Sequence, residues 1–543
     1  MMKKVVIVGG GSAGWMAAAY LNGALNKTGK EKTIDITLIE SPTTPRISVG
    51  EATIPSIGHI LSVIGIDELD FMKATDATFK QSIKYVNWLE NNGTFYHHPF
   101  SRVRPGPIDY SGPEWMRSQR NIAFSECVCA QTMICEWNMA PKMLGEWSFG
   151  APMKYAYHMN ASKFADYLRD FSVARGVHHI LADVTDVNVK DPNIITSVKL
   201  NDDREISGDL FIDSTGFTSL LIGKTLKVPH DDYSQWLLCN QAIVAQFPYE
   251  DYFPGIVRPY TTATALSAGW VWDIPMQNRR SLGYVHSSHF INETDARKEL
   301  LSYQGISEND DKVETRIIKF KVGQRRKAWV GNCIAIGLAG GFIEPLESTG
   351  LYLADLSAVM LAEHFPYETE HMEALAFRYN RILSNRYLEI LDFINMHYCL
   401  TRRTDSAFWK AVQQPEHINE RLQSKLEYWQ IKAPSNADFE DQAFAGYHYK
   451  SNSFDPIIDN RPPVDTAGLW NHESYESILY GMDFRGPEFK EKYGDKRPPS
   501  RVFPFIIDRL REAPKKLPPH HIWLHQVMGM KAYEEKMVPA GWV

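Results

Sequence analysis

The stretch Lys4-Val5-Val6-Ile7-Val8-Gly9-Gly10-Gly11-Ser12-Ala13-Gly14 decides the fold. An apolar run typical of a buried strand ends in glycines that satisfy GxGxxG, and the alanine-rich segment 12–25 continues as a predicted helix. Glycines in such a turn permit a tight bend, close approach of the backbone to a pyrophosphate and close packing of helix on strand. The start of the helix then offers free N–H groups to phosphates.

The residues after this turn complete a βαβ unit. Segment 34–39 alternates as a second strand, and Glu40 ends it, where a carboxylate can accept hydrogen bonds from ribose hydroxyls. A hairpin is predicted at 184–190 and 194–200, and further strands at 209–213 and 333–337. We therefore expect an α/β, Rossmann-like domain whose cofactor contacts include the following residues: Gly9, Gly11, Ser12, Ala13, Gly14, Glu40 and Gly337.

Composition narrows the class of protein. The chain has 543 residues and a net charge of −7, and this mild acidity argues against a nucleic-acid partner, whose binders usually show a concentrated basic face. It lacks an apolar stretch of the length that a membrane span requires, and glycines follow the short apolar run at the N-terminus without a signal-peptide cleavage site. The six cysteines contain no CxxC pair, so we expect free thiols, a cytoplasmic protein and no metal site. The 14 tryptophans fit either an aromatic core or planar ligands.

Three further stretches narrow the chemistry. Residues 49–56 read VGEATIPS, residues 269–275 read GWVWDIP, which contains WxWxIP, and residues 342–350 read FIEPLESTG, which contains FxxPxxSxG. Together with Phe79-Lys80, and in order from Met1 to about Leu400, they resemble the flavin-dependent halogenases of the tryptophan-halogenase family. The resemblance implies an FAD-binding domain of the flavin-monooxygenase type over 1–350, with an inserted substrate-pocket segment near 90–150. A mostly helical substrate-binding domain, 351–543, would follow.

The resemblance also assigns the reacting groups. Lys80 matches the catalytic lysine, which either polarises hypohalous acid or carries the halogen as a haloamine. Glu347, and not Glu344, matches the acid that assists transfer and takes the proton from the arenium intermediate. A structural alternative for Glu347 is an acid in the first turn of a helix. Thr349 and Gly350 are expected to bind the halide, and Lys84 is a decoy that would share a face with Lys80 if the segment were helical.

The same family match assigns three groups of neighbours. Further FAD contacts are expected from Val49, Gly50, Glu51, Ala52 and Ser348. A wall of indoles on one strand would keep the substrate away from the flavin, and it comprises Trp270, Trp272, Ile274 and Pro275. Without that role these tryptophans would simply fill a core. The substrate pocket is expected at His98, Phe100, Pro345 and Trp470. The pair His97-His98 lacks further ligands at a spacing that would bind a metal.

Substrate and partners follow less directly. Tryptophan halogenases hold the amino-acid zwitterion with paired tyrosines and a glutamate, whereas the stretch around 438–441 here lacks a Tyr-Tyr pair. That difference favours indole, or another arene without the zwitterion, over free tryptophan. The cofactors are FAD, as FADH2, and chloride or bromide. Because we find no second dinucleotide fingerprint, a separate NAD(P)H-dependent flavin reductase is the expected partner, and a homodimer is an option. The alternatives are a flavin-dependent aromatic hydroxylase and an FAD-binding regulatory protein; the Pro-rich stretch after about residue 487 has no assigned role.

Overall fold

The structure is a computed structural model of the chain. It describes residues 3–26, 31–47, 49–103, 111–117, 122–146, 149–252, 257–308, 310, 312–435, 438, 469–484 and 502–530. The predicted absence of a Tyr-Tyr pair concerns a stretch of which only Asp438 is described; its Oδ2 accepts hydrogen bonds from Trp429 Nε1 and the Ser435 amide. The Pro-rich stretch begins near residue 487, outside the described residues, which resume at Val502.

The predicted dinucleotide sheet is present. Its strands lie in the order β20-β21-β12-β1-β2-β8, and β1 pairs in parallel with β2 on one side and β12 on the other. Their bounds are Trp329–Val330, Cys333–Ala335, Leu210–Asp213, Lys4–Val8, Asp35–Glu40 and His178–Leu181, respectively. Helix α1 (Ser12–Leu25) leaves the glycine-rich turn and packs against α7 (Ala161–Val173) and α9 (Thr349–Glu363). The α/β, Rossmann-like prediction is confirmed.

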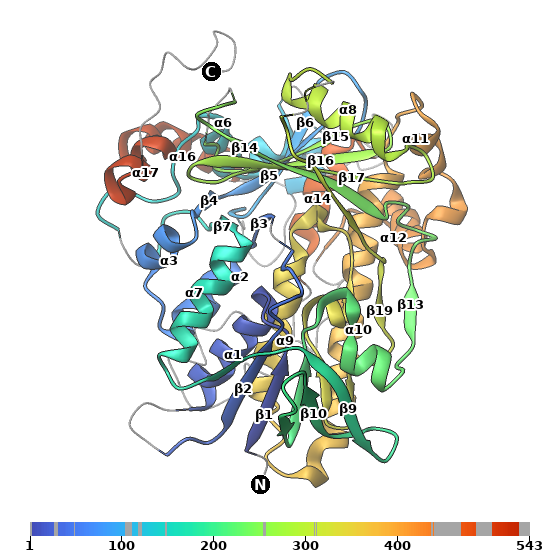
Figure 1. Cartoon of the computed structure of the whole chain (residues 1–543). Coiled ribbons are helices and arrows are strands. Elements are labelled where there is room, and N and C mark those ends of the chain that lie inside the picture. Colours follow the sequence, from blue (N-terminus) through green and yellow to red (C-terminus); the bar gives the residue numbers. More distant parts are fainter. Residues whose placement is uncertain are drawn as a thin grey trace.

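A second, larger sheet lies at the opposite end of the molecule (Figure 1). Its order is β18-β14-β17-β16-β15-β5-β6, and neighbouring strands are antiparallel except for the parallel pair β15 and β5. The strands span Arg316–Lys319, Gln241–Pro248, Arg279–His286, Gly269–Pro275, Thr261–Ala265, Ser82–Val86 and Phe95–Pro99, respectively. Helix α8 (Glu293–Gln304) covers one face by packing on β14 and β17, while the other face turns toward the rest of the molecule (Figure 1).

Three smaller sheets, each of three strands, accompany the two large ones. The one that positions the site has the order β3-β7-β4, with bounds Gly50–Ala52, Ala156–Asn160 and Thr78–Lys80. The predicted hairpin is part of the sheet β11-β10-β9, with bounds Glu205–Ser207, Ile194–Leu200 and Val184–Lys190. The third sheet has the order β13-β19-β22, with bounds His230–Asp232, Gly323–Arg325 and Gly341–Phe342.

The long helices α9 and α10 (Met372–Cys399) run between the two large sheets (Figure 1). The other α-helices, in chain order, are α2 (Ser56–Ile64), α3 (Glu68–Ala74), α4 (Ser111–Arg117), α5 (Phe124–Val128), α6 (Ala130–Glu136), α11 (Ala407–Ala411), α12 (Glu420–Ile431), α14 (His472–Gly481), α16 (Val502–Lys516) and α17 (His520–Met528). The predicted domain boundary at residue 350 lies within α9, which packs on α1, and the boundary stays a prediction.

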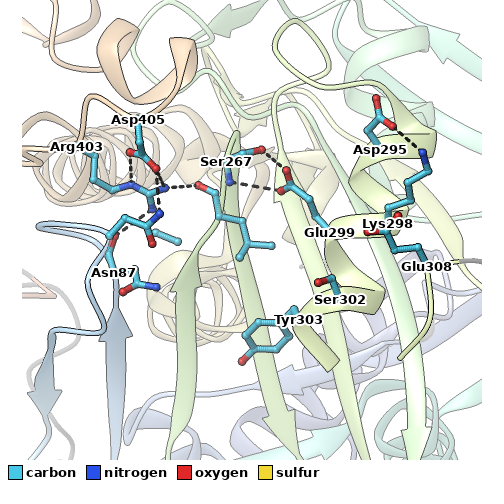
Figure 2. A pocket seen from close by; sticks show the side chains of 13 residues that line it. Asn87, Ser267, Asp295, Lys298, Glu299, Ser302, Tyr303, Glu308, Arg403 and Asp405 are labelled. Carbon is cyan, nitrogen blue, oxygen red and sulfur yellow. Dashed lines mark hydrogen bonds and ion pairs between the residues drawn. The ribbon is translucent and has the colours of Figure 1, made fainter. Parts of the chain in front are cut away.

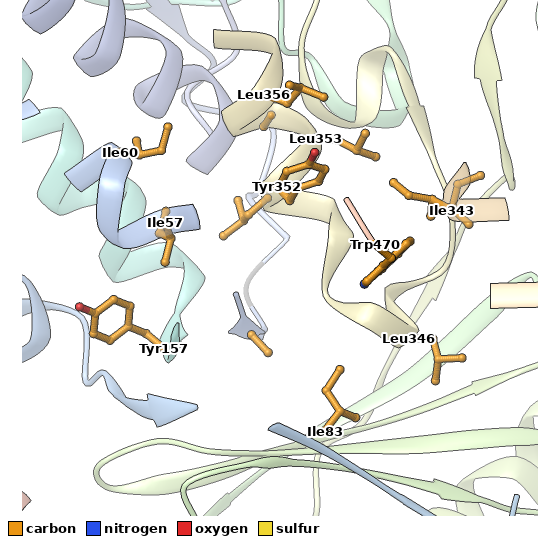
Figure 3. Packing of buried hydrophobic residues seen from close by; sticks show 14 of the residues in the cluster. Ile57, Ile60, Ile83, Tyr157, Ile343, Leu346, Tyr352, Leu353, Leu356 and Trp470 are labelled. Carbon is orange, nitrogen blue, oxygen red and sulfur yellow. The ribbon is translucent and has the colours of Figure 1, made fainter. Parts of the chain in front are cut away.

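The main hydrophobic core fills the space between these elements. Figure 3 shows Ile57 and Ile60 of α2 opposite Tyr352 and Leu356 of α9, with Ile83 of β5 at the base of the cluster. All five side chains are buried. Along the part of the chain that the structure describes, no helix combines the length and apolarity needed to cross a membrane.

Candidate active site

Gly9 and Gly14 of the glycine-rich turn have no room for a side chain. Gly9 has a φ of +116°, and a Cβ on Gly14 would lie 2.0 Å from the Gly9 carbonyl oxygen. Gly11 caps α1 without a side-chain hydrogen bond and faces open space, so the first amides of the helix can reach a phosphate. Gly337 also has a positive φ, and a Cβ there would lie 2.7 Å from the Ala13 methyl. This cradle fits a dinucleotide cofactor.

Glu40 closes one side of this cradle. Its carboxylate accepts a hydrogen bond from Trp15 Nε1 at 3.3 Å, pairs with Arg46 and lies 3.1 Å from His179 Nε2. A Cβ on Gly10 would lie 2.3 Å from Glu40 Cδ, so the carboxylate lies directly over the turn. Ser12, at the start of α1, donates instead to the Ala161 carbonyl at 3.1 Å.

The short strand β3 lies between two parts of the site: residue Val49 before it contacts Ala161, and Thr53 after it contacts Lys80. The Val49 carbonyl accepts from the Ala161 amide, and the Gly50 amide donates to Ser281 Oγ at 3.0 Å. Ala52 is buried, whereas Glu51 is half-buried. Withdrawal from water raises the pKa of Glu51 to about 7, against the opposing effect of the Lys80 ammonium. Glu51 and Lys80 therefore interact electrostatically.

Lys80 is fully buried at the end of β4. Its Nζ donates to the Thr53 carbonyl at 2.9 Å and to Ser348 Oγ at 2.7 Å, and it lies 5.5 Å from the centre of the Phe100 ring. Burial lowers its pKa to about 7, although Glu347 and Glu51 both favour the charged form. A lysine that can be amine or ammonium near neutral pH suits proton transfer or nucleophilic chemistry.

The turn that carries Glu347 contains an uncommon backbone conformation. Ser348 has a φ of +59°, which strains a residue other than glycine, and it caps α9 without a side-chain hydrogen bond. Thr349 follows, and its buried Oγ1 finds no hydrogen-bond partner among the described residues. A Cβ on Gly350 would meet open space. An orphaned hydroxyl at a helix start beside open space fits an anion, as predicted for the halide.

Glu347 is buried and held by three side chains. Tyr85 donates to Oε1, His98 Nδ1 lies 3.0 Å from Oε2, and His397 Nε2 lies 3.2 Å from Oε1. Burial alone would raise the pKa of Glu347, but the imidazoles of His98 and His397 hold it well below the usual range. Glu347 is thus an anion near Lys80, and the structural alternative of a simple helix-start acid leaves these contacts unexplained.

Glu344 has a separate environment. Tyr398 donates to Glu344 Oε1 at 2.5 Å, and burial raises the pKa of this carboxyl to about 7. The two acids of the motif therefore have separate environments. Of these two, only Glu347 interacts electrostatically with Lys80, in agreement with the assignment made from the family resemblance.

The two predicted wall tryptophans lie on the inner face of the large sheet. Trp270, Trp272 and Ile274 belong to the main core, whereas Val271 between them packs in the cluster under α8. The indoles are buried with centroids 6.4 Å apart, and Trp272 Nε1 has no hydrogen-bond partner among the described residues. Pro275 contacts β4, the strand that carries Lys80, because its carbonyl accepts a hydrogen bond from Thr78 Oγ1 at 2.6 Å.

The predicted pocket residues surround Glu347 and Lys80. His98 contacts Glu347, Phe100 lies beside Lys80, and Pro345 opens the turn that ends at Glu347. Trp470 is buried and stacks on Phe393, with centroids 4.0 Å apart and planes within 12°. Phe393 also lies 5.6 Å from the His98 ring, so an aromatic surface runs from Trp470 to the Glu347 cage.

Lys84 and His97 lie apart from this site. The segment is extended, not helical, so Lys80 and Lys84 occupy different strands, β4 and β5. Lys84 pairs with Glu136 at 2.8 Å, and His97 Nε2 contacts the same carboxylate. His97 and His98 thus reach different carboxylates, as expected for consecutive residues of a strand, and do not converge on a metal.

Several functional side chains escaped the sequence analysis. The sequence assigns no role to Tyr85 of β5 or Tyr96 of β6, and His397 and Phe393 carry no local signal because they lie in α10. Only the tertiary fold brings His397 to Glu347, 50 residues away along the chain. The helical period of α10 places both residues inward, but does not distinguish a polar contact from core packing.

A polar surface cleft of about 510 Å³ contains none of the predicted residues. Figure 2 shows its charged groups paired with near neighbours: Arg403 with Asp405, and Lys298 with Asp295. Glu299 accepts from Ser267. Because this cleft lies beside α8, on the outer side of the large sheet, its chemistry is separate from that of Lys80.

Comparison with known proteins gives consistent matches. The family model for tryptophan halogenase matches residues 4–497. The tryptophan 6-halogenase ThaL of Streptomyces albogriseolus is 34% identical over 89% of each chain, and the tryptophan 7-halogenase RebH of Lentzea aerocolonigenes is 33% identical over 97% of this chain and 99% of its own. The crystal structure of a tryptophan halogenase from Shewanella frigidimarina superposes with a TM-score of 0.86 at 33% identity, covering 97% of this chain and 98% of that one.

Proposed function

Because this chain belongs to the tryptophan halogenase family, we propose that it uses reduced FAD, O2 and bromide or chloride to halogenate indole or an indole derivative. Lys80 and Glu347 are the catalytic residues of this proposal. The observation that carries it is the buried Lys80 ammonium, bonded to the turn that contains Glu347 and beside the aromatic ring of Phe100.

The glycine-rich turn and β3 support the cofactor assignment. FAD, when bound and reduced, supplies the activation of O2 and the oxidation of the halide to hypohalous acid. Gly11 would admit its pyrophosphate at the start of α1, Gly14 lets the helix pack closely on the turn, and Glu40 would accept from its ribose. Trp270 and Trp272 would keep the arene out of the space over the flavin.

Lys80 and Glu347 divide the work on the substrate. Two N–H groups of the Lys80 ammonium are engaged by Thr53 and Ser348, which leaves one to donate to the oxygen of hypohalous acid. Such a donor makes the halogen more electrophilic toward the arene. Glu347, held as an anion, then accepts the proton that leaves the ring carbon.

Partner and compartment follow from the same chemistry. Reduced FAD requires a source of electrons, so we propose a separate NAD(P)H-dependent flavin reductase. The six cysteines of the chain are free thiols, which favours a reducing, cytoplasmic environment.

A reconstituted reaction tests this function. The protein, FAD, a flavin reductase and NADH are incubated with bromide or chloride and a panel of indoles, and products are analysed by mass spectrometry. We expect products with the isotope pattern of bromine or chlorine. Hydroxylated products without any halogenated species would support a flavin hydroxylase, and FAD binding without oxidised product would support a regulatory protein; either would overturn the proposal.

Two lysine variants test the catalytic assignment. Lys80→Ala should abolish halogenated product while FAD stays bound and hypohalous acid is still formed. Lys84→Ala is the matched control, because this lysine pairs with Glu136 and should leave halogenation near the wild-type rate. Halogenation retained by Lys80→Ala would contradict the assignment.

A further inference from the structure

The side chains around Glu347 form unequal numbers of hydrogen bonds to its two carboxylate oxygens. Oε1 receives the Tyr85 hydroxyl, His397 Nε2 at 3.2 Å and His98 Nδ1 at 3.1 Å. Within the described part of the chain, only His98 reaches Oε2, at 3.0 Å. A carboxylate has about four lone-pair sites, so Oε2 is the oxygen with capacity left to accept a proton.

His397 can stabilise the carboxylate only in one tautomer. Burial lowers the pKa of His397, although Glu347 opposes the effect, so the ring is neutral and carries a single N–H. Its Nε2 faces Glu347 and must hold that proton to donate. Nδ1 is then an acceptor, and the Tyr96 hydroxyl lies 3.1 Å away, placed to donate to it. The anionic Glu347, which can only accept, therefore sets the tautomer of His397, and the Tyr96 hydroxyl satisfies the nitrogen left without a proton.

Ring stacking fixes the geometry of this pair. Tyr85 stacks on Tyr96 with centroids 4.9 Å apart and on His397 with centroids 4.6 Å apart. Trp88 meets the His397 ring edge-on at 5.8 Å, and Trp270 of the predicted wall lies 6.3 Å beyond it. His397 is fully buried, so neither water nor rotation of the ring competes with the two hydrogen bonds.

We propose that Tyr96 and His397 are positioning residues for Glu347. Tyr96 donates to Nδ1 and holds the His397 ring in place, and the His397 Nε2–H holds Oε1 so that Oε2 takes the proton from the ring carbon. In that step the C–H bond of the arenium ion breaks, an O–H bond forms at Oε2, and the C–H electron pair restores the aromatic ring. The inference rests on the proposed function, in which Glu347 is the proton acceptor.

The other groups facing Glu347 are compatible with this arrangement. Lys80 approaches from β4 and interacts with Glu347 electrostatically, while Glu51 acts on Lys80. Burial, reinforced by the charge of Glu347, raises the pKa of Tyr85 and Tyr96 far above the ordinary value, so both remain protonated donors. From β6 comes His98, and α10 contributes His397. The orientation of the His397 ring toward Glu347 is therefore held by the hydrogen bond from Tyr96.

A double-mutant cycle tests the pair. His397→Leu removes a hydrogen bond to the charged Glu347 and should lower kcat about tenfold or more, whereas Tyr96→Phe removes a bond to a neutral ring and should lower kcat about fivefold, with the KM for the arene unchanged in both. His397→Gln should restore most of the rate, because its amide N–H can replace Nε2–H. In the His397→Leu background, where Tyr96 has lost its acceptor, Tyr96→Phe should cost nothing further.

A matched control removes a buried hydroxyl elsewhere on α10. Tyr379 donates to the Ser357 carbonyl at 3.4 Å and stacks edge-on against Trp329, so Tyr379→Phe should leave kcat unchanged. Unchanged kcat in Tyr96→Phe and His397→Leu would overturn the inference, and so would a His397→Gln variant as slow as His397→Leu. Glu347→Gln and the reconstituted reaction separate the two proposals: a wild type that forms no halogenated product overturns the proposed function, retained turnover in Glu347→Gln overturns the role of Glu347 as proton acceptor, and retained turnover in the pair variants alone overturns only the inference.

Discussion

Replacing Lys80 by Met should make the protein more stable and inactive. Burial lowers the pKa of Lys80 from 10.5 to about 7. Each pKa unit corresponds to about 1.4 kcal/mol, so holding the ammonium in the folded state at neutral pH costs about 5 kcal/mol. This figure already includes the attraction of Glu347 and Glu51. Met fills a similar volume without the charge, and so removes that cost.

The gain is offset by two acceptors that lose their donor. The Thr53 carbonyl and Ser348 Oγ both receive hydrogen bonds from Nζ. A buried acceptor left unsatisfied costs about 1–2 kcal/mol, so the net gain should be about 1–3 kcal/mol. A catalytic group that lowers stability is expected where function and stability compete.

The pH dependence gives this prediction a definite sign. Because the folded pKa lies below the ordinary one, the cost is fully present below about pH 7 and disappears as the pH rises toward 10.5. In thermal unfolding, Lys80→Met should therefore be more stable than the wild type at pH 7. It should lose that advantage by about pH 10, where an ordinary lysine begins to lose its proton and the neutral amine of the wild type still donates to Thr53 and Ser348.

The control is Lys84→Met, which breaks the ion pair with Glu136. That pair is partly buried, with side-chain exposures of 15% and 25%, so we expect a loss of about 1 kcal/mol rather than a gain. Lys80→Met should also form no halogenated product while still binding FAD. A Lys80→Met protein that unfolds more easily than the wild type at pH 7, or a difference that does not depend on pH, would refute the reasoning.

Three further predictions concern the lysine, the halide turn and the wall. With the reductase in excess, the rate of bromination should fall as the pH rises through about 7, since the ammonium is the donor; a rate that rises instead would favour a haloamine formed on the neutral amine. Thr349→Val removes a buried hydroxyl without a partner among the described residues. Steady-state kinetics should show the KM for bromide rise about tenfold while the KM for the arene stays constant. Equal changes in the two KM values would argue against a halide contact. Gly283→Ala would place a Cβ 2.0 Å from Trp272 Cζ2, so it should lower stability by about 1–3 kcal/mol in denaturant unfolding and raise the amount of NADH consumed per halogenated product. An unchanged ratio would mean that the indole does not separate the arene from the flavin.

The dinucleotide fold could be predicted because its signals are local. The strand, the glycines and the helix of residues 4–25 are adjacent in the chain, and Gly9 and Gly14 have steric reasons to lack a side chain. Trp270 and Trp272 were placed on one face because a strand alternates sides, and both side chains do belong to the same cluster.

Lys80 could be found only by its resemblance to known proteins. Its residue type and spacing favour a solvated surface charge, whereas its burial depends on β4 pairing with Ala156 on β7, far along the chain. The same long-range pairing makes the segment extended, so the idea of a helical face shared with Lys84 was wrong.

His397 could not be predicted at all. It is one of many inward residues of α10, and its contact with Glu347 requires the turn after β22 to meet the middle of the core. A helix pattern identifies the buried face but not the polar partner on it. Tyr96 could not be predicted either, because its role depends on the second nitrogen of His397.

Halogen transfer should take place at Lys80 and not in free solution. The direct measurement is bromination of indole by the wild type in the presence of excess trap for free hypobromous acid, with Lys80→Ala alongside. We predict that the wild type still forms bromoindole and leaves the trap largely unreacted, whereas Lys80→Ala brominates only the trap. Complete loss of bromoindole to the trap in the wild type would contradict the account.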